Sequence, residues 1–196
     1  MRIEPVTLTG RHVRLEPLAS AHRDALWEQA DDPELWRWTV SKIGSRSEFD
    51  AYLQRALDEA AGGKALPFAT VEAATGRVIG STRFANISAH DRRVEIGWTW
   101  IGRPWQRTAA NTEAKLLMLR HAFDTWGCVR VELKTAALNA VSRRAIARIG
   151  GVEEGTLRRH TRLDDGTWRD TVYFSILDDE WPAVRARLEA RLSEPR

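Results

Sequence analysis

The chain has 196 residues, of which 43% are hydrophobic and 29% charged, and its formal net charge is +3. The length suits one well-buried core, the composition is typical of a soluble globular protein, and the interleaving of basic with acidic residues disfavours a nucleic-acid partner. No stretch has the roughly 18 consecutive apolar residues of a membrane span, no N-terminal apolar run resembles a signal peptide, and the single cysteine, Cys128, excludes an internal disulfide and favours a cytoplasmic location.

The first half of the chain has the patterns of one strand, two helices and three further strands. In chain order we expect a strand over 12–18, helices over 20–30 and from Ser47 to Gly62-Gly63, and strands over 66–73, 78–84 and 93–101. Ser20 is a typical helix cap, and Thr75-Gly76 predicts a hairpin between the first two of the three strands.

The second half alternates helices with strands. We expect a helix over 112–126, a strand over 129–135, a short helix from Asn139 to Gly150-Gly151, strands over 157–163 and 168–176, and a last helix capped by Asp178 or Asp179. Frequent hairpins together with a strand–helix–strand unit predict a mixed α/β (α+β) layer fold. We expect a single domain over residues 1–196.

The joint between strand and helix in the middle of the chain, "RPWQRTAANTEAK" over 103–115, is rich in backbone N–H groups and poor in bulk. A helix N-terminus presents unpaired N–H groups and a partial positive charge, and small residues before it let a phosphate approach. The joint therefore indicates an anion cradle, although an ordinary strand-to-helix turn would have the same features.

Two motifs resemble those of the GCN5-related N-acetyltransferases (GNAT), and the similarity is greatest to the RimJ/RimL-like branch. The first is Glu95-Ile96-Gly97 followed by Trp105 and Thr112-Glu113-Ala114, and the second is Asn139 with Ser142 and Gly150. The chain departs from the usual loop because Arg107 to Ala110 stand where the family has glycines, and the loop is one residue longer. Asn111 is the expected N-cap of the helix.

The resemblance implies an acetyl-CoA-dependent N-acetyltransferase with a mixed, mostly antiparallel central sheet flanked by helices on both faces. It implies acetyl-CoA as co-substrate, no metal, and direct transfer in a ternary complex. The pyrophosphate would meet the loop N–H groups, the pantetheine would pair with the strand end and with an amide side chain, and an N–H near Trp98 would polarise the thioester. The expected acetyl-CoA-binding residues are Trp98, Thr99, Trp100, Arg107, Thr108, Ala109, Ala110, Asn111, Thr112 and Asn139.

The resemblance also implies two catalytic residues. Glu95 is the candidate base, acting directly or through water, and strand alternation turns its side chain away from Val94 and Ile96. Ser142 is the candidate donor to the departing thiolate. The alternatives are an ion pair of Glu95 with an arginine, and simple helix-start roles for Ser142 and Asn139.

Other polar residues indicate no further chemistry. His121 is expected to be structural, and the remaining histidines have no metal-ligand spacing: His12, His22, His90 and His160. Three arginines, Arg143, Arg144 and Arg148, would either meet the 3′-phosphate of CoA or form a solvated helix face.

The acceptor amine is predicted less directly. Trp36 and Trp38 with Trp168 and Asp170 are expected to form a substrate groove, unless the first two pack in the core. A groove of mixed charge with aromatic walls suits a peptide, which favours a protein N-terminal amine. The alternatives are a small-molecule acetyltransferase, acting on a drug or polyamine, and a CoA-binding module without turnover. The oligomeric state is left open, with a homodimer among the options.

Overall fold

The structure is a computed structural model that describes Met1 and residues 3–194. One eight-stranded sheet has the order β1-β2-β3-β4-β5-β6-β8-β7. Its strands are β1 (Leu8–Thr9), β2 (Val13–Pro17), β3 (Leu66–Glu72), β4 (Val78–Ser88), β5 (Arg93–Ile101), β6 (Arg130–Ala136), β7 (Val152–Arg162) and β8 (Trp168–Leu177). The helices are α1 (Arg23–Ala30), α2 (Pro33–Trp36), α3 (Arg46–Ala61), α4 (Ala109–Arg120), α5 (Ala140–Arg148) and α6 (Trp181–Ser193). Short helical turns occur at η1 (Ser20–His22), η2 (Arg103–Trp105) and η3 (His121–Thr125).

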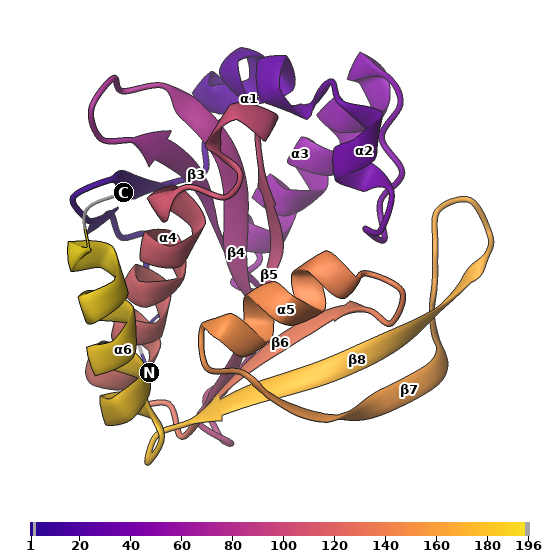
Figure 1. The fold of residues 1–196 in the computed structure, drawn as a ribbon. Helices are drawn as coiled ribbons and strands as arrows, with labels where there is room; N and C mark the ends of the chain where they lie inside the picture. Colours follow the sequence, from indigo (N-terminus) through magenta and orange to yellow (C-terminus); the bar gives the residue numbers. More distant parts are fainter. Residues whose placement is uncertain (2, 195–196) are drawn as a thin grey trace.

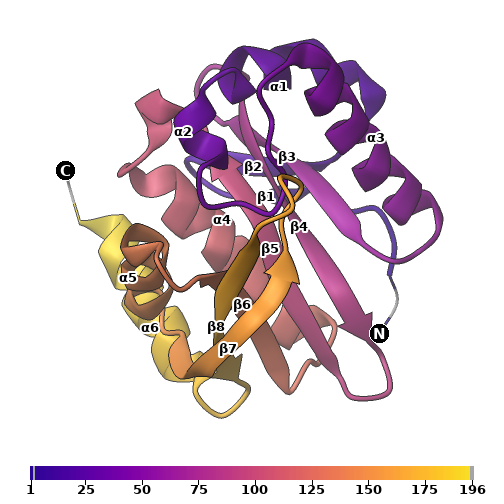
Figure 2. The same ribbon diagram turned by 90° about the vertical axis from the view of Figure 1, so that its right-hand side faces the viewer.

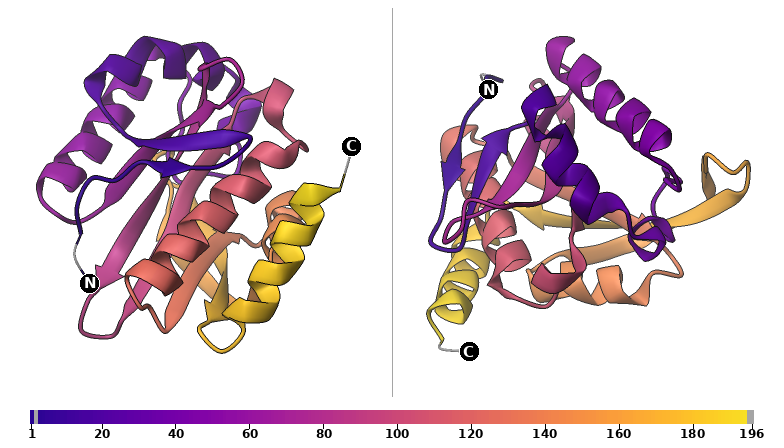
Figure 3. Two further views of the ribbon diagram at one scale, coloured as in Figure 1. Left: turned by 90° about the vertical axis from the view of Figure 1, so that its left-hand side faces the viewer. Right: turned by 90° about the horizontal axis from the view of Figure 1, so that it is seen from above.

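Helices cover both faces of the sheet (Figures 1 and 3). On one face α4, α5 and α6 bury the main core, to which Met118, Ile146 and Leu188 contribute. On the other face α1, α2 and α3 enclose a second, smaller cluster built on Trp36, Phe49 and other apolar side chains, with Trp100 of β5. The β7–β8 hairpin extends beyond the layers and reaches toward α2 (Figure 2). The centre of the sheet is therefore covered by apolar clusters on both faces.

The sheet opens between β5 and β6. All other neighbouring strands pair antiparallel, but these two run parallel and pair only at residues 93–95 with 130–132. Beyond Glu95 they diverge, so the remaining length of β5 has no strand partner on that side. The parting lies between the starts of α4 and α5, which follow β5 and β6 in the chain.

The expected fold class is confirmed, but several boundaries differ. Helix α4 begins at Ala109 rather than Thr112, because Thr108 and not Asn111 is its N-cap: the Thr108 hydroxyl accepts the Ala110 N–H at 3.2 Å. Strand β7 starts at Val152, five residues before the expected strand, and it is an exposed edge strand whose sequence shows no clear alternation. The short elements β1 and α2 were not anticipated.

Two further properties concern the chain as a whole. Cys128 is 2% exposed, and burial raises the pKa of its thiol to about 11. Among the described residues no helix is both long enough and apolar enough to cross a membrane.

Candidate active site

The bulge in β5 lies directly beside the parting of the strands. Ser81 pairs with Trp100 and Arg83 with Gly97, so Thr82 of β4 faces two residues of β5, Trp98 and Thr99. Trp98 has a φ of 48°, a left-handed conformation that costs a non-glycine residue roughly 1 kcal/mol or more. A bulge leaves one residue out of the ladder and re-aims its backbone. The bulge therefore leaves backbone groups of β5 outside the strand ladder, next to the point where β5 and β6 diverge.

The loop before α4 holds the helix N-terminus open. Arg107 has a φ of 63°, the conformation that glycine ordinarily supplies. The Thr108 hydroxyl donates to the Trp105 carbonyl at 2.7 Å and accepts from Ala110, which fixes the first turn. An arginine therefore adopts the conformation that a glycine would provide, and the loop keeps its shape without one.

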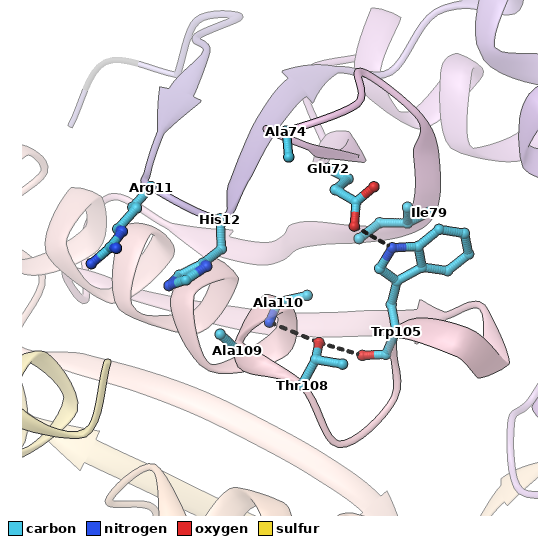
Figure 4. A pocket seen from close by; sticks show the side chains of 9 residues that line it. All are labelled: Arg11, His12, Glu72, Ala74, Ile79, Trp105, Thr108, Ala109 and Ala110. Carbon is cyan, nitrogen blue, oxygen red and sulfur yellow. Dashed lines mark hydrogen bonds between the residues drawn. The ribbon is translucent and has the colours of Figure 1, made fainter. Parts of the chain in front are cut away.

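A cavity of about 190 Å³ opens beside this first turn (Figure 4). Thr108, Ala109 and Ala110 form one side, and Arg11 and His12 approach from the β1–β2 turn. Across the cavity the Trp105 indole donates to Glu72 at 2.7 Å. Hydrogen bonds from Thr75 and then Trp105 hold the pKa of the Glu72 carboxyl below its ordinary value. An anion would therefore be accommodated on the side of Arg11 and the helix, away from Glu72.

Glu113 fixes the β1–β2 turn above the helix. Its buried carboxylate accepts the backbone N–H groups of Arg11, His12 and Val13 at 2.9, 2.6 and 2.7 Å. Gly10 lies so close that an added Cβ would be 2.4 Å from the carboxylate carbon. Charge-assisted hydrogen bonds of this kind are strong. Glu113 thus positions the two basic residues of the cavity without binding a ligand itself.

The geometry fits a pyrophosphate-bearing co-substrate. The first N–H groups of α4 have no partner within the helix, and among the described residues the Arg11 guanidinium makes no ion pair. Both features favour a phosphate at this end, and the unpaired length of β5 offers backbone groups to an extended amide chain.

The predicted acetyltransfer residue Glu95 is buried, 3% exposed, at the point where the strands part. Its carboxylate forms an ion pair with Lys134 at 2.8 Å and accepts from the Asn86 amide at 2.5 Å. The pair expected for a structural Glu95 is thus present, with a lysine as partner instead of an arginine. Burial alone would lower the pKa of Lys134, but the charge and hydrogen bond of Glu95, with Tyr173, outweigh it and raise that pKa.

The start of α5 holds the second pair of predicted residues. The Asn139 side-chain oxygen accepts the Ser142 N–H at 3.0 Å, so Asn139 is the N-cap of α5 and only its amide NH₂ group is left for a ligand. The Ser142 hydroxyl is half-buried and has no hydrogen-bond partner among the described residues. It is therefore available as a donor.

Comparison with known proteins supports the same interpretation of this geometry. The model of the acetyltransferase (GNAT) domain matches residues 12–152. The chain belongs to the GNAT acetyltransferase family. This confirms the predicted family and its RimJ/RimL-like branch. It also confirms that the protein is an N-acetyltransferase and that acetyl-CoA is its co-substrate.

Three relatives illustrate the similarity. The chain is 32% identical over 106 residues to the putative ribosomal N-acetyltransferase YdaF of Bacillus subtilis (strain 168), a match that covers 54% of this chain and only 57% of that relative. A crystal structure of a putative acetyltransferase from T. thermophilus is 38% identical with a TM-score of 0.89, covering 98% of this chain and 100% of that one. Mycobacterium smegmatis RimJ in complex with CoA-disulfide is 26% identical with a TM-score of 0.78, covering 91% and 88%.

In this GNAT acetyltransferase the predicted acetyl-CoA residues divide between the two faces of the sheet. Trp98 is 39% exposed, with the Arg83 guanidinium 5.0 Å from its ring. Thr99 faces α4 on the opposite side, where it meets Lys115. The Trp100 ring is buried against Trp36, so only its backbone is available to a ligand.

The predicted acceptor groove is partly assembled. Trp36 is 2% exposed and its indole donates to the Ala30 carbonyl at 2.8 Å, which is the core-packing alternative. The Trp38 carbonyl accepts from Arg169 of β8 at 3.3 Å, so the loop after α2 and the hairpin do meet. Trp168 is exposed at the start of β8, whereas the Asp170 carboxylate already accepts a hydrogen bond from the Arg159 backbone N–H at 2.7 Å.

The remaining polar residues are placed as follows. Arg143 forms an ion pair with Glu153 at 2.9 Å, Arg144 is exposed, and the His121 ring packs on Phe84 and Trp126. Within the described part of the chain, no group of three or more His, Cys, Asp or Glu side chains is placed to hold a metal ion.

Sequence reasoning missed three residues of this GNAT site: Glu113 as a clamp, Lys134 as the partner of Glu95, and Lys115 beneath the bulge. Lys115 carried a usable signal. It follows Asn111 by four positions and precedes Met118 by three, so it belongs to the stripe of α4 that faces the sheet. A lysine in such a stripe is buried, and a buried lysine requires an explanation.

Proposed function

We propose that this protein transfers the acetyl group of acetyl-CoA directly to a primary amine in a ternary complex, with a protein or peptide N-terminal amine as the favoured acceptor. The observation that supports it most is the strained bulge at Trp98 beside the parted strands β5 and β6. It presents free backbone groups between the two helix starts, where a thioester and an incoming amine can meet.

The assignment of roles follows from placement. Acetyl-CoA supplies an activated acetyl group as a thioester. The first turn of α4 with Arg11 would hold the pyrophosphate, the unpaired edge of β5 and the Asn139 amide would hold the pantetheine, and a bulge N–H would polarise the carbonyl. The Ser142 hydroxyl would donate to the departing thiolate.

Glu95 would act through water. Its carboxylate already accepts from Lys134 and Asn86, so a proton passed directly from the amine would compete with both donors. A water molecule between the amine and Glu95 would accept the proton while the ion pair stays intact, an arrangement that general-base catalysis allows.

Three considerations favour a peptide N-terminal amine. The relatives include a protein named as a putative ribosomal N-acetyltransferase and a RimJ structure. An α-amine has a reference pKa near 8 against about 10.4 for lysine, so a larger fraction is neutral at pH 7. The acceptor side of β5 has Trp98 and the loop–hairpin contact at Trp38 as walls, which suits an extended peptide.

The test is a competition for acetyl transfer, followed by mass spectrometry. The acceptors are a short peptide with a free N-terminus, the same peptide blocked at its N-terminus but bearing a lysine, and a polyamine. Preferential acetylation of the first supports the proposal. Preference for the lysine or the polyamine would replace the acceptor, and binding of acetyl-CoA without any transfer would favour a module that has lost turnover.

The cytoplasmic location, the single-domain organisation and the homodimer remain predictions that accompany this proposal. Size-exclusion chromatography with light scattering measures the oligomeric state.

A further inference from the structure

Lys115 is the least accounted-for charged group near the site. It lies on α4 and is 6% exposed, yet no carboxylate of the described residues pairs with it. Its ammonium donates to the Thr99 hydroxyl at 2.5 Å and reaches the Thr82 hydroxyl at 3.4 Å. Burying a lysine with only neutral partners is costly, so the position invites a functional reason.

The two threonines belong to the bulge. Thr82 is the residue of β4 that faces Trp98 and Thr99, and the two hydroxyls lie 2.7 Å apart. Both also approach the Gly97 carbonyl, at 3.4 Å each. Lys115 is therefore bonded to the deformed segment of β5 from beneath, on the α4 side, while Trp98 stands on the other side.

We propose that Lys115 is a positioning residue that links α4 to the β5 bulge by hydrogen bonds. Its positive charge strengthens the electrostatic effect of the backbone N–H groups that polarise the carbonyl of the acetyl thioester. This inference rests on the proposed function. It gives the lysine a role that neither Glu95 nor Ser142 fills, because it acts through Thr99 and the bulge and does not touch the amine.

The placement of Lys115 along α4 supports this role. Lys115 lies six residues after Ala109, which is about 9 Å along a helix. The same helix thus contacts the proposed pyrophosphate site with its first turn and the bulge with Lys115. Such a link would fix the distance between the pyrophosphate and the thioester of a bound acetyl-CoA. A fixed distance helps to orient the thioester for reaction.

The charge of Lys115 should vary near neutral pH. Burial lowers its pKa from 10.5 to about 7. The groups that face the ammonium are Thr82 from β4 and Thr99 from β5, with Met118 beside them on α4, and none of them titrates near pH 7. On the same helix Glu113 is turned to the β1–β2 turn, and the His121 ring, whose pKa is lowered by burial, stacks with Phe84 and Trp126.

The test measures polarisation of the thioester without any acceptor. Acetyl-CoA labelled with ¹³C at the carbonyl is bound to the wild type, to Lys115→Met and to the control Lys64→Met, in which an exposed lysine far from the bulge is removed. Isotope-edited infrared spectra report the carbonyl band. We expect a shift to lower frequency at pH 6 in the wild type and the control, which diminishes as the pH rises through about 7. In Lys115→Met the shift should be smaller and independent of pH.

Kinetics give a second readout. Turnover should fall roughly tenfold or more in Lys115→Met, with the KM for acetyl-CoA little changed, because the lost interaction acts on the developing charge. Thr99→Val, which removes the hydroxyl but keeps the shape, should cause a similar loss, and the double variant should lose no more than either single one. This variant also serves if Lys115→Met does not fold.

The outcomes separate the two proposals. A bound carbonyl band with the same shift and pH dependence in Lys115→Met overturns the role of Lys115 alone. Additive losses in the double variant do the same. Absence of any bound band in the wild type would overturn the proposed function, and this inference with it.

Discussion

Two lysines on opposite sides of β5, one buried and one half-buried, show how differently the surroundings of an ammonium group can shift its pKa. Lys134 lies on one face with Glu95 at 2.8 Å, and its pKa is raised despite burial. Lys115 lies on the other face with two threonines, and its pKa is lowered to about 7. Burial opposes the charge in both cases, but Lys134 is only half-buried and has a carboxylate partner, so the partner and the smaller burial together keep its charge favourable.

The same distinction applies to the whole site. Groups with partners, Glu95 with Lys134 and Glu113 with three N–H donors, join elements that lie far apart in the chain. Groups without strong partners, the Lys115 ammonium, the first N–H groups of α4 and the Ser142 hydroxyl, surround the opening between β5 and β6. We therefore expect loss of a paired group to reduce stability and loss of an unpaired one to reduce binding or turnover.

The largest effect of a single substitution is expected at Lys134. Lys134→Met should lower the free energy of unfolding by about 3 kcal/mol, because it leaves the buried Glu95 carboxylate without a counterion. Urea denaturation measures the change, with Lys64→Met as the control. The double variant Glu95→Gln with Lys134→Met should recover part of the loss. If Lys134→Met were as stable as the wild type, the ion pair with Glu95 would not stabilise the fold, and the contrast with Lys115 would be wrong.

The opposite behaviour is expected at Lys115, with a pH dependence of known sign. Its pKa is about 7 when folded and 10.5 when exposed, so between these values the unfolded chain binds more protons. The free energy of unfolding should therefore rise with pH from about 7 to 10.5, by up to about 1.4 kcal/mol per unit from this group. Below pH 7 the lysine is charged in both states and its contribution is constant.

Lys115→Met removes this pH-dependent contribution to the free energy of unfolding. At about pH 6 the variant should be more stable than the wild type by about 2 kcal/mol, since an apolar side chain replaces an unpaired buried charge. Because the wild type gains stability as the pH rises above about 7, this difference should shrink and then reverse at high pH. Chemical denaturation at several pH values measures it, and a variant that is less stable than the wild type in mild acid would show that the lysine holds the fold.

A smaller effect is expected at Ser142. Ser142→Ala should lower turnover about tenfold, at the low end for a proton donor because water can replace a half-buried hydroxyl. Acetyl-CoA affinity and melting temperature should stay the same, since the hydroxyl has no partner among the described residues to lose. Ser142→Thr keeps a hydroxyl and should retain most of the rate. Weakened binding in the alanine variant would contradict a role confined to the transition state.

The smallest effect is expected at the start of α4. Ala109→Pro deletes one backbone N–H at the first helical position, where proline is well tolerated, and Thr108 before it already has the extended conformation that a following proline requires. Acetyl-CoA should bind about fivefold more weakly, because this N–H is one of several donors. Calorimetry measures the affinity, and Ala109→Ser, which keeps the N–H, is the control. Unchanged binding by the proline variant would place the pyrophosphate elsewhere.

The sequence predicted the part of the site that depends on local patterns. Strand alternation placed Glu95, and the cap signal placed Asn139 at the start of α5. The N-cap of α4 was misplaced because Asn111 and Thr108 are both good caps, and only the loop geometry decides between them. Neither the bulge at Trp98 nor the partners of Lys115 could be predicted, because both depend on the register of β4 against β5, a contact between strands that no single segment encodes.

The burial of Cys128 has a practical consequence for all these experiments. It is the one cysteine of the chain, it is buried, and its pKa of about 11 leaves almost no thiolate at neutral pH. Since the thiolate is the reactive form, reagents that colour free thiols should respond to released CoA with little background from the folded protein. Continuous optical assays of every variant are thus feasible without altering the chain, and a slow rise in blank signal would report unfolding.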